Sequence, residues 1–148
     1  MLTILTRLDA NFYGIPTRDV LEITPLVPLR ETPQAHAPLV GVCTYRGRIA
    51  PVLDLSLLLA GRRSRPRYST RILFLERHGG AGDVLGLIAE GVTETLTLDD
   101  ALLAAGLSLR APDQAWLGAM VQHEIGLIQM LEPVGLALPA LPDGGSAV

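Results

Sequence analysis

The sequence predicts an all-β protein, built as a barrel or a sandwich. Short apolar segments recur about every 8–12 residues along the chain, and residues typical of turns separate them. No long amphipathic helical pattern lies between these segments, so an architecture of alternating strands and helices is disfavoured. The chain has 148 residues, of which 49% are hydrophobic. A single domain of this size can bury a sizeable core without a metal or a disulfide.

The N-terminal half predicts two hairpins that flank a short helical turn and a proline-rich connection. Apolar and polar residues alternate in the first segment, and Asp9-Ala10-Asn11 is a turn sequence that leads into a second strand. Pro16 and Pro25 bracket eight residues, a length that suits a helical turn. The expected elements are strands at 2–8 and 12–15, a helical turn at 17–24, and strands at 40–45 and 48–55 around the turn Arg46-Gly47.

The C-terminal half predicts further short strands between polar or glycine-rich turns. A helical turn is expected just before Gly61, because glycine readily ends a helix. The other elements are a strand at 71–77, a glycine turn at 78–83, a bent strand or strand pair at 84–98 hinged at Glu90-Gly91, a brief helix at 99–106, a turn at 112–116, and strands at 117–121 and 125–131. The proline- and glycine-rich residues 134–148 predict a flexible tail.

Composition excludes several classes of function. The net charge is -3 and all 12 basic residues are arginines, so mechanisms that need a lysine are excluded and nucleic acid is not an expected partner. One cysteine allows no internal disulfide and no cysteine-based zinc site, and we expect neither a metal nor a cofactor. No apolar run reaches the length of a membrane span, and the N-terminus does not resemble a signal peptide. We therefore expect a cytoplasmic protein without direct membrane insertion.

Two motifs suggest chemistry that their context does not support. The glycines of HGGAGD resemble a phosphate-binding loop, but the apolar segment that follows predicts a strand and not a helix N-terminus. A hairpin turn is the favoured interpretation. Cys43 could act as a nucleophile, yet it lies in an apolar strand, where a small buried side chain is the commoner role.

Asp54 and the arginine-dense loop each have two interpretations. Asp54 could be a general base in an apolar pocket, but we favour a cap of the helical turn that follows it. The arginines of the loop at 62–71 could bind an acidic partner, although a solvated loop is the favoured interpretation. Arg46 at the hairpin turn is open on local grounds. It is either a surface residue before the glycine that the turn needs, or a guanidinium presented to a carboxylate of a partner.

The segment from Gly41 to Leu55 resembles the signature of the CheW family, the coupling proteins of bacterial chemosensory arrays. The positions that match are Gly41, Arg46, Gly47, Pro51, Asp54 and Leu55. The sequences FYGIPTRDVLEI, VLGLIAEGVTETLTL and WLGAMVQHEIGLIQML resemble further family segments, so the resemblance covers about residues 3 to 132. Thr44-Tyr45 and Glu90 depart from the residues usual in the family.

The resemblance implies a fold of two packed SH3-like five-stranded β-barrels in a single CheW-like domain at 1–133. Its first subdomain would hold about 1–60 plus 123–133, and its second about 70–121. Gly47, Pro51 and Asp54 would be structural turn and cap residues. The resemblance also implies a protein without catalytic activity.

The same resemblance implies two protein partners. A groove between the barrels would bind the cytoplasmic tip of chemoreceptors through Val20, Glu22, Ile23 and Arg46. Exposed strand and turn surface around Gly41, Ile72, Gly86 and Gly91 would contact the regulatory domain of a CheA-type histidine kinase. The protein would thus associate with membrane-bound receptor arrays through its partners. Two alternatives stay open: the same adaptor in a pathway other than flagellar chemotaxis, such as surface sensing, twitching or second-messenger control, and a β-barrel that binds a small ligand such as a flavin.

Overall fold

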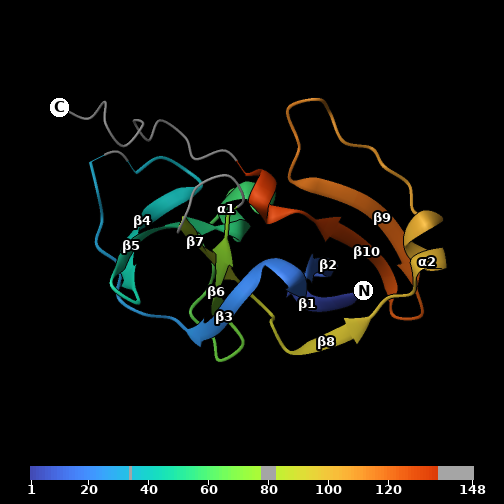
Figure 1. Cartoon of the computed structure of the whole chain (residues 1–148), viewed down its shortest axis with the longest axis horizontal. Helices are drawn as coiled ribbons and strands as arrows, with labels where there is room; N and C mark the ends of the chain where they lie inside the picture. Colours follow the sequence, from blue (N-terminus) through green and yellow to red (C-terminus); the bar gives the residue numbers. More distant parts are fainter. Residues whose placement is uncertain (34, 78–82, 137–148) are drawn as a thin grey trace.

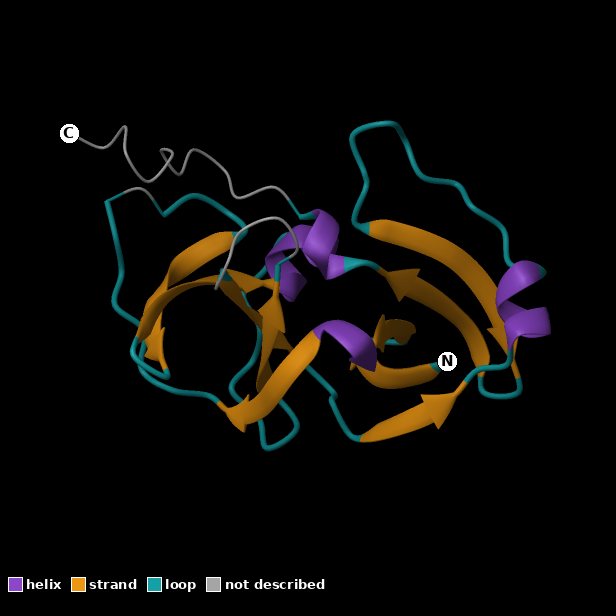
Figure 2. Ribbon diagram, viewed as in Figure 1, coloured by secondary structure: helices purple, strands orange, loops and turns teal. Residues whose placement is uncertain are grey.

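Two five-stranded sheets make up the computed structural model, which describes residues 1–33, 35–77 and 83–136. Figure 1 shows them as two lobes that lie side by side, and Figure 2 shows that strands dominate both. The first sheet has the order β8-β1-β2-β10-β9, and the second has the order β3-β6-β7-β5-β4. The prediction of an all-β fold with short helical turns is confirmed.

The strands of the first sheet are β1 (Leu2–Leu8), β2 (Asn11–Pro16), β8 (Glu94–Thr97), β9 (Leu117–His123) and β10 (Gly126–Leu131). The strands of the second sheet are β3 (Val20–Pro25), β4 (Leu39–Tyr45), β5 (Arg48–Asp54), β6 (Arg71–Glu76) and β7 (Val84–Ala89). The helical elements are η1 (Thr17–Asp19), α1 (Leu55–Ala60), α2 (Asp100–Ala104) and η2 (Pro133–Gly135). Most neighbouring strands are antiparallel, and the pairs β10–β2 and β5–β7 are parallel.

Three apolar clusters explain why several strands are apolar on both faces. One cluster is formed mainly by side chains of the first sheet, and a second mainly by side chains of the second sheet. The largest contains side chains of both sheets and lies between them. On β6, Ile72 and Phe74 enter the second sheet's own cluster, whereas Leu73 and Leu75 enter the cluster between the sheets. Burial of both faces therefore produces continuous apolar runs in place of polar alternation.

The strands group into sheets differently from the predicted subdomains. The strands β3, β4 and β5 belong to the second sheet with β6 and β7, and both β8 and β9 belong to the first. The predicted hinge at Glu90-Gly91 lies at a crossover, because the chain passes there from β7 in the second sheet to β8 in the first. A sequence shows that such a hinge exists but not which sheet each side joins, since sheet membership depends on pairing between distant segments.

Of the predicted short elements, some are present as expected and others differ in the structure. The predicted helical turn at 17–24 is helical only in η1, and the rest is the strand β3, which pairs with β6. The helix closed by Gly61 is present as α1, and Gly61 has the left-handed φ of 70° that a glycine cap requires. At the start of the predicted tail, residues 134 and 135 belong to η2, and Leu136 is buried in the inter-sheet cluster. Residues 137–148 and most of the glycine turn, 78–82, lie outside the described residues.

Candidate functional site

The β4–β5 hairpin tip holds Arg46 in a conformation that arginine rarely adopts. Tyr45 pairs with Arg48, so Arg46 and Gly47 form a two-residue turn with φ values of 47° and 80°. Positive φ at both central residues defines the tight hairpin turn that matches the twist of the strands. For a residue other than glycine this conformation costs about 1–2 kcal/mol. The fold thus fixes the direction in which Arg46 leaves the hairpin.

Glu22 on β3 joins the hairpin tip to the opposite edge of the second sheet. Its Oε1 accepts a hydrogen bond from the Tyr45 hydroxyl at 3.1 Å and lies 3.0 Å from Nη2 of Arg46. Tyr45 stacks on Phe74 with 4.3 Å between ring centroids. Burial raises the pKa of Tyr45, and the hydrogen bond to Glu22 raises it further, so the phenol stays protonated and donates. Because β3 and β4 are the two edge strands, this cluster brings the edges of the sheet together.

A groove lies between the second sheet and the first, and β3 supplies Ile23 to it. It is about 360 Å³ in volume, and its lining includes Ile4 of β1, Ile23 of β3, Arg71 of β6 and Val92 before β8. Two apolar side chains of β3, Leu21 and Ile23, remain partly exposed, and Ile23 lines the groove. An apolar groove with a charged end can bind the apolar face of a helix.

The structure brings together some of the residues predicted to bind the receptor and separates others. Glu22 and Arg46 form an ion pair with side chains 41% and 71% exposed, so both can reach a partner. Ile23 lies on the other face of β3 and lines the groove. Val20 is half-buried, packs against the inter-sheet cluster and does not line the groove.

The residues predicted to bind the kinase are explained by contacts within the chain. Ile72 is completely buried and cannot touch a partner. A Cβ on Gly41 would lie 2.7 Å from the carbonyl oxygen of Arg30, and one on Gly86 would lie 3.0 Å from Val52. A Cβ on Gly91 would lie only 2.4 Å from a backbone oxygen of β1. Close approach does require these glycines, but the approaching segments belong to this protein.

Asp54 is the helix cap that the sequence predicts. Its Oδ1 accepts a hydrogen bond from the backbone N–H of Ser56 at the start of α1. The same carboxylate also accepts hydrogen bonds from the backbone N–H and the hydroxyl of Ser64, at 2.8 and 2.6 Å. Asp54 therefore fixes both α1 and the loop that follows it.

Glu90 and Arg62 form a polar link between the sheets that the sequence analysis missed. Oε2 of Glu90 lies 2.6 Å from Nη1 of Arg62 and accepts a hydrogen bond from the Ser56 hydroxyl at 2.9 Å. Nη2 of Arg62 lies 3.0 Å from Asp9 in the β1–β2 turn of the first sheet. The signal was present in the sequence, because a carboxylate between two apolar strands needs a partner and an arginine-dense loop supplies one. At least part of this loop is therefore structural.

This link makes stability depend on pH. Burial alone would raise the pKa of Glu90, but hydrogen bonds from Arg62, Ser56 and the Arg65 backbone outweigh it and lower the pKa below the ordinary value of 4.5. The unfolded chain then takes up a proton more readily, so the contribution of Glu90 is present above pH 4.5 and is lost as pH falls through the lower folded value.

We expect the urea midpoint of the wild type to fall between pH 5 and pH 3, and the fall to be smaller in Glu90→Gln. Other carboxylates titrate in both proteins, so only the difference between the two curves reports on Glu90. Parallel curves for the two proteins would show that Glu90 is not held in its ionised form.

The described residues give little support for Cys43 as a nucleophile or for a metal-binding site. Burial raises the pKa of the Cys43 thiol, which packs against the second sheet's cluster, so it stays protonated at neutral pH. Among the described residues there is no group of histidine, cysteine and acidic side chains that could hold a metal ion. None of the helices in the described ranges is long and apolar enough to span a membrane.

Two packed β-sheets, a groove lined in part by apolar side chains and an ion-paired hairpin tip are features that suit the binding of another protein. The model of the CheW-like domain matches residues 3–138, and the chain belongs to this family. The fold is similar to the crystal structure of the scaffolding protein TtCheW from Thermoanaerobacter tengcongensis, with a TM-score of 0.70 and 23% sequence identity over 88% of this chain and 82% of that one. Comparison with curated proteins gives no match. Family membership supports a chemotaxis adaptor or scaffold in signal transduction, and proteins of this family are scaffolds and not enzymes.

Proposed function

We propose that this protein is a chemosensory adaptor that couples methyl-accepting chemoreceptors to a CheA-type histidine kinase. The observation that supports it best is the groove between β3 and β8, with Ile23 exposed in its wall and with Glu22 of the same strand paired to Arg46 of the hairpin tip. The cytoplasmic tip of a chemoreceptor is a helical hairpin, and an apolar helix face would bury Ile23. The Glu22–Arg46 pair and Arg71 would set the orientation of the hairpin by charge.

The kinase would bind elsewhere, so that one adaptor can hold both partners at once. We place this contact on exposed strand and turn surface outside the groove, with Gly41, Ile72, Gly86 and Gly91 supporting that surface from beneath. Two modest contacts of this kind gain strength when many adaptors act together in an array. Such an adaptor would work in the cytoplasm, next to membrane receptors that it reaches only through its partners. The choice between flagellar chemotaxis and another chemosensory pathway stays open.

Ile23→Asp tests the receptor groove. A carboxylate in the apolar wall should weaken binding of a receptor-tip fragment at least about tenfold and leave binding of the kinase regulatory domain unchanged. Arg46→Ala should weaken the same binding about three- to fivefold, as expected for an exposed charge. Titration calorimetry with each partner fragment measures both effects.

Leu109→Asp is the matched control, because it places the same charge on a leucine that is 76% exposed in the loop between α2 and β9. It should bind both partners as the wild type does. Receptor binding by Ile23→Asp at wild-type affinity would reject the groove as the receptor site. Failure of the folded wild type to bind either partner would reject the proposed function.

A further inference from the structure

A second hollow lies between the sheets, beside the arginine-dense loop. It has a volume of about 580 Å³, and its lining includes Leu5, Arg7 and Phe12 of the first sheet and Arg67 of the loop. Thr93 and Glu94 line both this hollow and the groove proposed for the receptor, so the segment before β8 is a wall that the two share. The second hollow is thus a separate surface next to the first.

The charges of this hollow are only partly balanced within the protein. Two of its carboxylates are already paired: Glu90 with Arg62, and Asp9 with both Arg62 and Arg65. Arg7 and Arg67, in contrast, form no ion pair within the described ranges. Arg7 is held over the ring of Phe12 at 5.5 Å, and its Nε donates to the backbone carbonyl of Asp9 at 3.0 Å. Both guanidinium groups therefore retain donors for an incoming carboxylate.

The loop that carries Arg67 is held in place by its own hydrogen bonds. Thr70 donates from its hydroxyl to the carbonyl of Arg65 at 2.5 Å and from its backbone N–H to the carbonyl of Arg67 at 3.0 Å. The carbonyl of Ser69 accepts from Val92 at 2.9 Å, which ties the loop to the shared wall. Tyr68, between Arg67 and Ser69, is 98% exposed. A tyrosine and an arginine on a pre-ordered turn are typical of residues that dominate binding energy in protein interfaces.

We propose that this hollow and the Arg67–Tyr68 turn bind an acidic segment of a partner protein. Carboxylates of the segment pair with Arg7 and Arg67, and an apolar side chain between them packs on Phe12, which is half-buried and lines the hollow. Tyr68 is exposed between Arg67 and Ser69, which both line the hollow, and an aromatic ring at this place suits a peptide chain better than a small anion. Glu94 forms no ion pair in the described part of the chain and opposes such a segment by repulsion, so it sets an upper limit on affinity.

The probe for this proposal is a fluorescein-labelled peptide of sequence Glu-Glu-Leu-Glu-Glu, titrated with the full chain at low salt and followed by fluorescence anisotropy. We expect saturable binding that weakens as salt is added. Arg67→Ala should weaken binding about three- to fivefold, and Arg7→Gln combined with Arg67→Ala about tenfold. Glu94→Gln should strengthen binding about two- to threefold, because it removes the repulsion.

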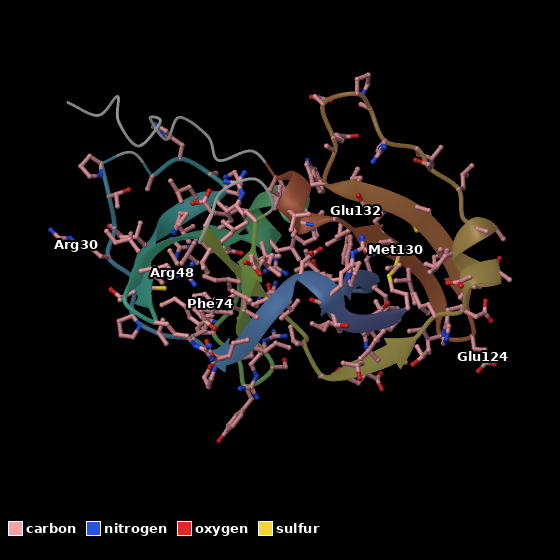
Figure 3. The ribbon with its side chains drawn as sticks, viewed as in Figure 1. Arg30, Arg48, Phe74, Glu124, Met130 and Glu132 are labelled. Carbon is pink, nitrogen blue, oxygen red and sulfur yellow. The ribbon has the colours of Figure 1, made fainter. Side chains whose placement is uncertain are left out.

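Arg30→Ala is the matched control, since Arg30 projects outward from the far end of the second sheet (Figure 3). The wild-type affinity should be retained in Arg30→Ala, and a peptide with glutamine in place of glutamate should not bind. Equal weakening by Arg30→Ala and Arg67→Ala would reduce the effect to general charge attraction and overturn the proposal. The proposal is also overturned if the folded wild type shows no saturable binding, or if glutarate competes as well as the unlabelled peptide, which would mean a site for small anions. Ile23→Asp should bind the receptor-tip fragment poorly and bind the acidic peptide as the wild type does. That result would show that the two surfaces are independent.

Discussion

Gly91→Ala should lower the free energy of unfolding by about 3 kcal/mol. Gly91 has a φ of 61°, and an added Cβ would lie 2.4 Å from the carbonyl oxygen of Arg7 on β1. The strand cannot move aside easily, because the backbone N–H of Arg7 donates to the carbonyl of Gly91 and the hydroxyl of Thr6 donates to the carbonyl of Glu90. Relief of the overlap would therefore break contacts that hold the crossover between the sheets.

Gly61→Ala is the control that separates two causes of lost stability, the steric overlap of an added Cβ and the strain of a left-handed backbone. Gly61 has a similar φ of 70°, but no atom lies within 4 Å of an added Cβ. That variant should lose only about 1 kcal/mol, the cost of the left-handed conformation. Urea unfolding of both variants measures the difference. Equal losses would show that close packing is not the reason for Gly91, and wild-type stability with loss of kinase binding would restore the role predicted for it from the sequence.

The sequence predicted best those features that depend on neighbouring residues. The strands, the glycine that ends α1, and Asp54 as a cap all follow from patterns a few residues long. The family resemblance, which rests on several such patterns in order, was confirmed by the match to the CheW-like domain.

Features that depend on distant contacts were predicted less well. Gly41, Gly86 and Gly91 were predicted to lie at a kinase contact, whereas in the structure a Cβ at each would meet atoms of this same chain. A sequence does not show which segment approaches a glycine closely. The arginine loop was interpreted as one solvated segment. In the structure Arg62 binds Glu90 and Asp9, while Arg67 remains available. Only the fold brings residues 9, 62 and 90 together.

Asp54→Ala is the second variant with a large expected effect, a loss of about 3 kcal/mol in the free energy of unfolding. Asp54 is 1% exposed, and the substitution leaves the N–H groups of Ser56 and Ser64 without their acceptor. Hydrogen bonds to a charged carboxylate contribute more than those between neutral groups, and a buried donor without an acceptor adds a further cost.

Asp99→Ala is the matched control for the cap. Asp99 accepts a hydrogen bond from the N–H of Leu102 at the start of α2, so it has the same role at an exposed site. Its loss should cost about 1 kcal/mol, the typical value for a helix cap. If the two alanine variants unfold at the same urea concentration, the bonds from Ser64 contribute nothing. A larger loss at Asp54 means that the carboxylate orders the arginine loop as well as the helix. The folded fraction of Asp54→Ala should then bind the acidic peptide more weakly while it keeps its affinity for the receptor tip.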